Sequence, residues 1–214
     1  MTLLYLVRHG ETDWNRQRRI QGSTDIPLND TGRAQAARAG DLLARREWDG
    51  ILASPLSRAY ETAQIIADRI GLEAPAAFDE VVERAYGDAE GLSARQLAAR
   101  FPLGVAVPGR ESRESVAARV IPALLRLAEG HHGKHFIVAT HGGVIRTVLN
   151  AVAPGAAIHR GVPISNGSIH SFRLSDGALE LVAFDDPIDD ASVEPGAADL
   201  TQQNAMERRE SDLR

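Results

Sequence analysis

The sequence predicts an α/β fold, a three-layer α/β/α sandwich around a mostly parallel central sheet. Short apolar segments alternate with longer segments whose apolar residues recur at helical spacing, a pattern typical of such sheets. The 214 residues, 43% of them apolar, suffice for one core with at most a small cap. Since no internal repeat divides the chain, one main domain is expected.

Five short apolar segments are predicted to be strands. They are residues 3–7, 50–53, 136–139, 168–174 and 179–184. The last two follow each other closely, which predicts an antiparallel hairpin at the end of the sheet.

Four helices are predicted between these strands. The first covers residues 29–46 with Asn29 as its N-cap, and the fourth covers residues 144–152. The second and third each carry one apolar stripe, and Pro122 is expected to kink the third. The two stripes consist of Ala59, Ala63, Ile66 and Ile70 and of Val116, Val120, Leu124 and Leu127.

Composition excludes several classes of protein. The absence of cysteine removes disulfides, thiolate metal sites and a cysteine nucleophile. No apolar run is long enough for a membrane helix and no targeting pattern opens the chain, so a cytoplasmic protein without membrane contact is expected. The net charge is −5, but residues 185–214 hold nine acids and three arginines, so the rest is close to neutral. No surface for binding nucleic acid is predicted.

The C-terminal segment is predicted to differ from the rest. The folded domain is expected over residues 1–186, followed by an acidic tail over residues 187–214. Prolines and acids predict a linker over residues 185–199, and residues 200–213 have the pattern of a short polar helix. Three roles stay open for this tail: folding over the pocket, contacting a second subunit in a homodimer, or none.

The first chemical motif lies at the end of the first predicted strand. Arg8, His9 and Gly10 follow that strand directly, and Asn15 comes shortly after. An imidazole and a guanidinium beside a glycine that allows a sharp turn provide a nucleophile and a phosphate clamp.

The second motif follows the second strand. Ser54 is expected to cap the next helix, with Pro55 in its first turn and Arg58 near its positive end. A phosphate there would meet both backbone amides and a guanidinium. Taken alone, this segment favours an ordinary surface arginine on a well-capped helix, and only the other motifs favour a phosphate site.

The third motif repeats the first, because His141 and Gly142 also stand between an apolar strand and a helix. The carboxyl ends of parallel strands share one edge of a sheet, so His9, Arg58 and His141 are expected to converge there. A lone histidine after a strand is usually a turn residue, and convergence is what favours catalysis.

A proton donor is expected in the polar segment around Glu83. A carboxyl group at the lip of a phosphate site suits a general acid that later serves as base. Spacing alone leaves Asp88 and Glu90 as alternatives.

Together these motifs resemble the histidine phosphatase superfamily over residues 2–184, in its broad-specificity phosphatase branch. The resemblance implies a phosphoglycerate mutase-like fold and an enzyme of the histidine acid phosphatase type. It implies that His9 becomes a phosphohistidine and that Glu83, not its neighbours, is the acid. The implied phosphate-binding groups are Arg8, Arg58, His141, Asn15 and Gly142.

Neither a metal nor another cofactor is expected. Two arginines and a cationic His141 would balance the charge of a phosphate dianion. His131, His132 and His135 are close in sequence, but their glycine-flanked segment is typical of a solvated loop.

The predicted activity is hydrolysis of a small phosphorylated metabolite. Only 58 positions separate Glu83 from His141, and the short cap segment 92–113 lacks tryptophan and an Arg-Arg pair, unlike the family's mutases. Residues 83–87 partly resemble the mutases, whereas residues 87–91 resemble the broad phosphatases with Ala89 in place of tryptophan. A cofactor-dependent phosphoglycerate mutase is the alternative, and an inactive binding or scaffold protein is a remote one.

Residues 21–28 are expected to form the rim of the pocket. Gln21, Ser23 and Thr24 are candidate contacts to the non-phosphate part of the substrate, although a plain polar turn explains them equally well. Arg16, Arg18 and Arg19 are expected on a solvated face, outside the site.

Overall fold

The structure is a computed structural model that describes residues 1–188. The predicted polar helix over residues 200–213, and all of the predicted linker beyond residue 188, lie outside the described residues.

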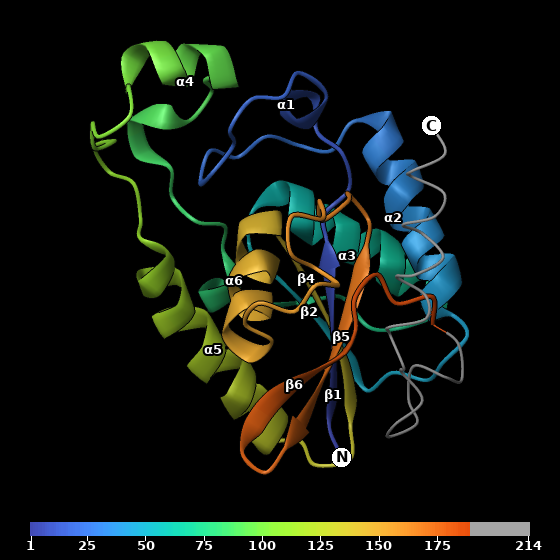
Figure 1. Cartoon of the computed structure of the whole chain (residues 1–214). Helices are drawn as coiled ribbons and strands as arrows, with labels where there is room; N and C mark the ends of the chain where they lie inside the picture. The colour runs from blue at the N-terminus through green and yellow to red at the C-terminus, as the bar shows by residue number, and fades with distance from the viewer. Residues whose placement is uncertain (189–214) are drawn as a thin grey trace, which may run out of the picture.

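One six-stranded sheet forms the centre of the molecule, in the order β3-β2-β4-β1-β5-β6 (Figure 1). The four strands at one side run parallel, while β5 pairs antiparallel with both β1 and β6. The strands are β1 (Leu3–Arg8), β2 (Gly50–Ala53), β3 (Ala76–Ala77), β4 (His135–Thr140), β5 (Ile169–Ser175) and β6 (Ala178–Ala183). The mixed α/β class, the mostly parallel sheet and the terminal hairpin are confirmed.

Helices cover both faces of the sheet. Helices α5 and α6 lie on one face and α2 and α3 on the other (Figure 1). The helices are α1 (Asp13–Arg16), α2 (Asp30–Leu43), α3 (Ser57–Ile70), α4 (Ala94–Arg100), α5 (Arg113–Glu129) and α6 (Gly142–Val152). Two single-turn 3₁₀ helices, η1 (Asp79–Val81) and η2 (Gly87–Ala89), precede α4.

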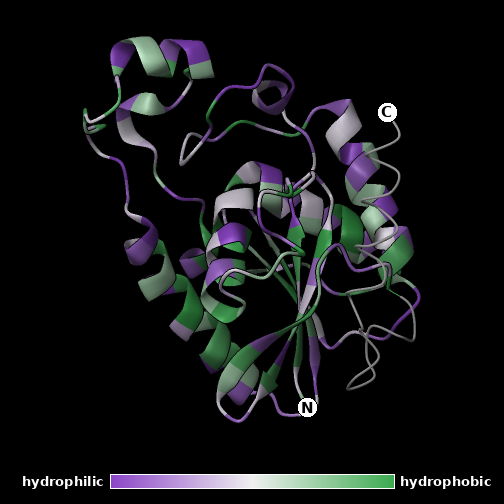
Figure 2. Ribbon diagram, viewed as in Figure 1, coloured by the Kyte–Doolittle hydropathy of each residue, from purple (hydrophilic) through white to green (hydrophobic). Residues whose placement is uncertain are grey.

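Strand β1 shows how the sequence builds two cores. Leu4 and Leu6 face the α5 and α6 layer, whereas Leu3, Tyr5 and Val7 face the α2 and α3 layer. This is the alternation that a strand buried on both faces requires. Hydrophobic residues accordingly gather on the strands and on the inner sides of the helices (Figure 2). Fully burying one such leucine contributes about 1.5–3 kcal/mol.

Helix α2 is positioned by a close backbone approach. Asn29 caps the helix as expected, its Oδ1 accepting a hydrogen bond from Gly32 N at 2.9 Å. A Cβ on Gly10 would lie 2.2 Å from the Gly32 carbonyl oxygen. Only glycines at both positions let the helix start pack against the turn that carries His9.

The structure corrects some predicted boundaries. The predicted Ser54 cap is wrong, because α3 starts at Ser57 and its N-cap Leu56 has no side-chain hydrogen bond. Helix α2 ends at Leu43, and α5 continues as one helix through Pro122. The two-residue β3 and the short α1 and α4 were not predicted, since such lengths give little periodic signal.

No helix within residues 1–188 combines the length and the apolar character needed to cross a membrane.

Candidate active site

A cavity of about 310 Å³ opens at the carboxyl edge of the parallel strands. The turns after β1, β2 and β4 bring their polar side chains to this one place, as strands sharing an edge must. The cavity is lined by Arg8, His9, Asn15, Arg19, Ile20, Gln21, Gly22, Arg58, Glu83, Tyr86, Gly142, Gly143, Arg146 and Ile164.

His9 is a buried imidazole with one ring nitrogen already fixed. Its Nδ1 lies 2.7 Å from the Gly10 carbonyl oxygen, which can only accept, so Nδ1 carries the proton and donates. Nε2 is thereby left with a lone pair. Burial, with Arg8 and Arg58 adding repulsion, holds the pKa of His9 well below its usual value. The ring is therefore neutral, as a nucleophile must be.

Arg8 and Arg58 bring two guanidinium groups to the His9 ring. Arg8 donates from Nη1 to the Ile164 carbonyl oxygen. Arg58 is fully buried and donates to two carbonyl oxygens of the opposite loop, Gly22 at 2.7 Å and Thr24 at 2.9 Å. Burial lowers the pKa of both groups, yet an arginine keeps its charge in proteins.

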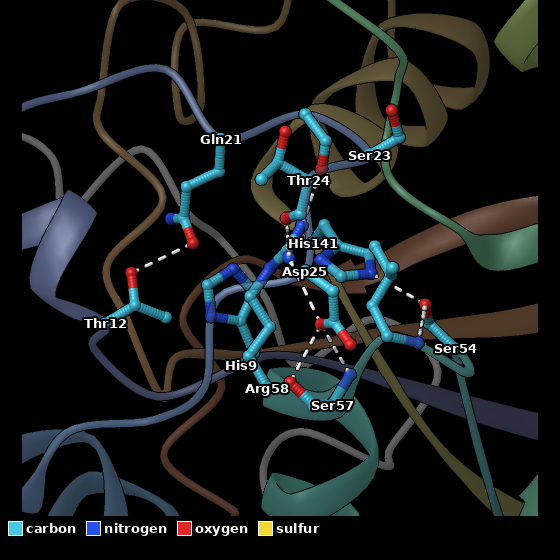
Figure 3. A network of polar contacts seen from close by, with 12 residues as sticks. His9, Thr12, Gln21, Ser23, Thr24, Asp25, Ser54, Ser57, Arg58 and His141 are labelled. Carbon is cyan, nitrogen blue, oxygen red and sulfur yellow. Dashed lines mark hydrogen bonds and ion pairs between the residues drawn. The ribbon is translucent and has the colours of Figure 1, made fainter. Parts of the chain in front are cut away.

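His141 lies against His9, with 5.2 Å between the ring centroids (Figure 3). Its Nε2 is 2.8 Å from the Ser54 hydroxyl, so Ser54 orients this ring instead of capping a helix. In the free site His141 is neutral, because burial and the nearby Arg58 keep its pKa well below the usual value. The cationic His141 expected beside a bound phosphate stays a prediction. The ring is fully buried and does not itself line the cavity.

Three buried nitrogens at this place have no hydrogen-bond partner within the described part of the chain. They are Nε of Arg8, Nε of Arg58 and Nδ1 of His141. Buried polar groups are normally paired with a hydrogen-bond partner. Unpaired nitrogens clustered around His9 therefore suit the binding of an anion with several oxygens. A phosphate group has that character.

Glu83 is the carboxyl group that lines the cavity. Its Oε2 accepts from Gly143 N at 3.0 Å, at the start of α6, and its Oε1 accepts from Arg84 N at 2.9 Å. Burial raises the pKa of Glu83, although the two amides and the arginines oppose that shift. A carboxyl group that holds its proton to higher pH suits a general acid.

The two alternative acids have other partners. Asp88 is exposed and pairs with Arg100 at 3.3 Å. Glu90 accepts from the backbone and side chains of Ser23 and Thr24 and from Tyr86 N, and these hydrogen bonds lower its pKa. Neither residue lines the cavity, so the structure favours Glu83 on geometry.

Asn15 lines the cavity and its side-chain amide is fixed by hydrogen bonds. Oδ1 accepts from Thr12 N at 3.2 Å and from Asn166 Nδ2 at 3.1 Å. With the oxygen occupied, the NH₂ group is the part of Asn15 available to a ligand.

The three candidate rim residues have different positions. Gln21 lines the cavity and accepts from the Thr12 hydroxyl at 2.9 Å (Figure 3). Ser23 and Thr24 bind Glu90 and do not line the cavity. They hold the loop that supports Arg58.

Several lining residues were not among the predicted ones. Arg19 is exposed, as expected, but it also lines the cavity, whereas it was predicted to lie outside the site. Arg146 stands four positions after Gly142 on α6, so helical spacing could have indicated it. Tyr86 and Ile164 lie in irregular segments, where the sequence offers no such signal.

The described residues include no group of three histidine, cysteine, aspartate or glutamate side chains placed to hold a metal ion. His131 is exposed, and its Nδ1 is paired with the Leu127 carbonyl oxygen at 2.9 Å.

A family model described as "Histidine phosphatase superfamily (branch 1)" matches residues 4–187. The chain belongs to this superfamily. It is 39% identical to the uncharacterized phosphatase PhoE of Bacillus subtilis (strain 168), covering 86% of this chain and 89% of that protein. It is 38% identical to phosphoglycerate mutase-like protein 4 of Arabidopsis thaliana, covering 81% of this chain and 80% of the relative.

A solved mycobacterial structure shares the fold of this histidine phosphatase. It is a glucosyl-3-phosphoglycerate phosphatase in complex with VO3, with a TM-score of 0.75 and 28% identity. The match covers 85% of this chain and 98% of that one. Phosphatases and mutase-like proteins thus both occur among the relatives.

Proposed function

We propose that this histidine phosphatase hydrolyses a small phosphorylated metabolite through a phosphohistidine on His9. The observation that carries the proposal is the state of His9, with Nδ1 donating to Gly10 and Nε2 left as a lone pair beside two guanidinium groups. That arrangement provides a nucleophile and an anion clamp at one point.

The reaction follows from these positions in two steps. His9 Nε2 attacks phosphorus in line, so a P–N bond forms while the P–O bond to the leaving group breaks. Glu83 gives its proton to the leaving oxygen. A water molecule then attacks phosphorus, Glu83 takes back a proton, and the P–N bond breaks to release phosphate and restore neutral His9.

The positive charge comes from the chain's own groups. Arg8 and Arg58 bring two charges to a phosphate dianion, and their free Nε atoms are donors in a buried setting. The Asn15 amide and the backbone at Gly142 add neutral donors, and bound phosphate would favour protonation of His141. This balance supports a reaction that needs no metal.

Hydrolysis is favoured over mutase activity by the cap. None of the cavity-lining residues comes from the segment 92–113, which contains α4 and a loop with Leu103 fully exposed. A mutase must keep its phosphoenzyme from water, which requires a closing lid. The mutase-like relative is the reason to test both activities.

The deciding experiment measures phosphate release from a panel of phosphomonoesters beside interconversion of 2- and 3-phosphoglycerate. Phosphate release should exceed interconversion, added 2,3-bisphosphoglycerate should act as a substrate or competitor, and chelators should change nothing. Rapid interconversion that needs 2,3-bisphosphoglycerate and releases little phosphate would establish the mutase instead. Loss of phosphate release with a chelator would contradict metal independence.

A further inference from the structure

Residues 164–168 run beside the end of β1 and hold it from one side. Arg8 N donates to the Ser168 carbonyl oxygen and Gly167 N donates to the Arg8 carbonyl oxygen, both at 3.0 Å. Between them, the Asn166 side chain reaches into the site. Its Nδ2 lies 3.0 Å from the His9 carbonyl oxygen and 3.1 Å from Asn15 Oδ1.

We propose that Asn166 is a positioning residue that sets the orientation of both His9 and Asn15 through this one NH₂ group. The inference rests on the proposed phosphohistidine at His9, and adds a group that touches neither phosphate nor leaving group. Its role is to fix two groups from different elements relative to each other.

The first half of the role concerns the peptide after His9. Asn166 holds the carbonyl oxygen of the peptide between His9 and Gly10, and Thr62 holds its amide, accepting from Gly10 N at 3.1 Å. That peptide leads to the Gly10 carbonyl, which in turn receives the proton of His9 Nδ1. A rotation of this peptide would move the group that selects the reactive ring nitrogen.

The second half concerns Asn15. A side-chain amide can turn over, exchanging its oxygen and nitrogen, unless its partners differ in character. Asn166 and Thr12 both donate to Asn15 Oδ1, which fixes the oxygen away from the ligand and the NH₂ toward it. If the Asn15 amide were turned over, its oxygen, which can only accept hydrogen bonds, would face the phosphate oxygens.

Asparagine suits this place because two acceptor oxygens need two N–H donors at one atom. Aspartate has the same shape but cannot donate when ionised, and it would set a charge against both oxygens. Alanine removes the donors without adding repulsion. An asparagine that merely stabilised the turn would affect folding and leave the reaction rate of folded enzyme unchanged.

The test compares the rate of phosphoenzyme formation in single turnovers of wild type, Asn166→Ala and Asn166→Asp. The reaction is quenched in alkali, and the phosphoenzyme is counted as protein-bound phosphate that acid then releases. The rate should fall about 10- to 100-fold for alanine, as misplacement of about 1 Å does, and further for aspartate. Relative to wild type at each pH, the aspartate variant should recover as the pH falls, because a protonated carboxyl regains one donor. Asn150→Asp, the same change at an exposed position of α6, is the control and should react as wild type does.

A double-mutant cycle tests whether Asn166 acts through Asn15. Asn15→Ala and Asn166→Ala should together slow the reaction by less than the product of their separate effects. Wild-type rates in both Asn166 variants, or a lower melting temperature with an unchanged rate per folded enzyme, would overturn the proposal. Fully additive effects would overturn the part that runs through Asn15. Failure of the wild type to form phosphohistidine would instead reject the proposed function.

Discussion

The floor and the wall of the cavity are built by different means. The floor, consisting of His9 and Arg58 with the buried His141 ring behind them, stands on turns that follow the strands of the sheet. The wall, consisting of residues 19–25 and 83–90, contains one short 3₁₀ helix. Side-chain hydrogen bonds of Glu90 join its two segments, and Ile20 adds main-chain bonds to Gly91 and Leu92. Main-chain hydrogen bonds of the sheet hold the catalytic side chains in place. Individual side-chain hydrogen bonds hold the loops that surround the substrate.

The geometry of the floor is fixed by main-chain hydrogen bonds between β1 and β4. Arg8 pairs with Thr140 at the end of the β1 and β4 register, and His9 N donates to the Thr140 carbonyl oxygen at 2.9 Å. The two catalytic turns are therefore fixed to each other by main-chain bonds. We therefore expect a substitution of the His9 or His141 side chain to remove a function with little movement of this backbone.

In the wall, the hydrogen bonds of one carboxylate, Glu90, take the place of main-chain hydrogen bonds between strands. Glu90 binds the amides of Ser23, Thr24 and Tyr86 and two hydroxyl groups. The loop that it holds presents carbonyl oxygens to Arg58. A substitution here should act at a distance, through the position of that guanidinium.

His9→Ala gives the largest expected effect and tests the floor. The substitution removes the nitrogen that forms the bond to phosphorus, while main-chain hydrogen bonds keep the surrounding backbone in place. Activity should therefore fall roughly 10⁴-fold or more. Melting temperature and phosphate release should be measured together, with acid-labile phosphate on wild-type His9 as the positive signal. Activity close to wild type, or stable labelling of a serine, would contradict the mechanism.

Glu83→Gln should give the next largest effect and depend on the leaving group. Alkyl phosphates need a proton on the departing oxygen and should slow about 10²- to 10⁴-fold. p-Nitrophenyl phosphate releases a stable phenolate and should slow far less. Asp88→Asn, the same kind of change at an exposed carboxylate of the neighbouring segment, is the control. Equal losses on both substrates would mean that Glu83 is structural.

The pH profile should show both shifted groups. His9 reacts when neutral and its pKa is depressed, so activity should persist below the usual histidine range. Glu83 reacts when protonated and its pKa is raised, so activity on alkyl phosphates should decline, by about tenfold per unit, once the pH exceeds that raised value. Comparison with Glu83→Gln on one substrate separates the enzyme's alkaline limb from titration of the substrate. An alkaline limb unchanged in the variant would assign it to another group.

The same division explains how far the sequence alone could lead. His9, Arg58 and His141 follow predicted strands, and the rule that parallel strands end at one edge is enough to bring them together. The charge of His141 in the free site could not be predicted, because it depends on burial and on Arg58, neither of which spacing reports.

Residues 21–28 were predicted as a rim of the pocket, but the contacts that hold the wall together were not, for a different reason. Its contacts join residues far apart in the chain, such as Ser23 with Glu90 across 67 positions and Thr24 with Glu90 across 66. No local periodicity encodes such pairs. Asp88 and Glu90 could not be separated from Glu83 until their actual partners were seen.

Glu90→Gln should have the smallest effect and tests the wall. Glutamine can keep its oxygen toward Ser23 and Tyr86, but its NH₂ would then face the amide and hydroxyl donors of Thr24. Loosening that loop should weaken the carbonyl contacts of Arg58 and raise KM, and the inhibition constant of inorganic phosphate, about tenfold, or ~1.4 kcal/mol. The turnover number should change less, because main-chain hydrogen bonds of the sheet keep the floor in place. A KM equal to that of Asp88→Asn would show that the wall does not depend on this carboxylate, whereas a fall in turnover as large as that of Glu83→Gln would mean that floor and wall are not separable.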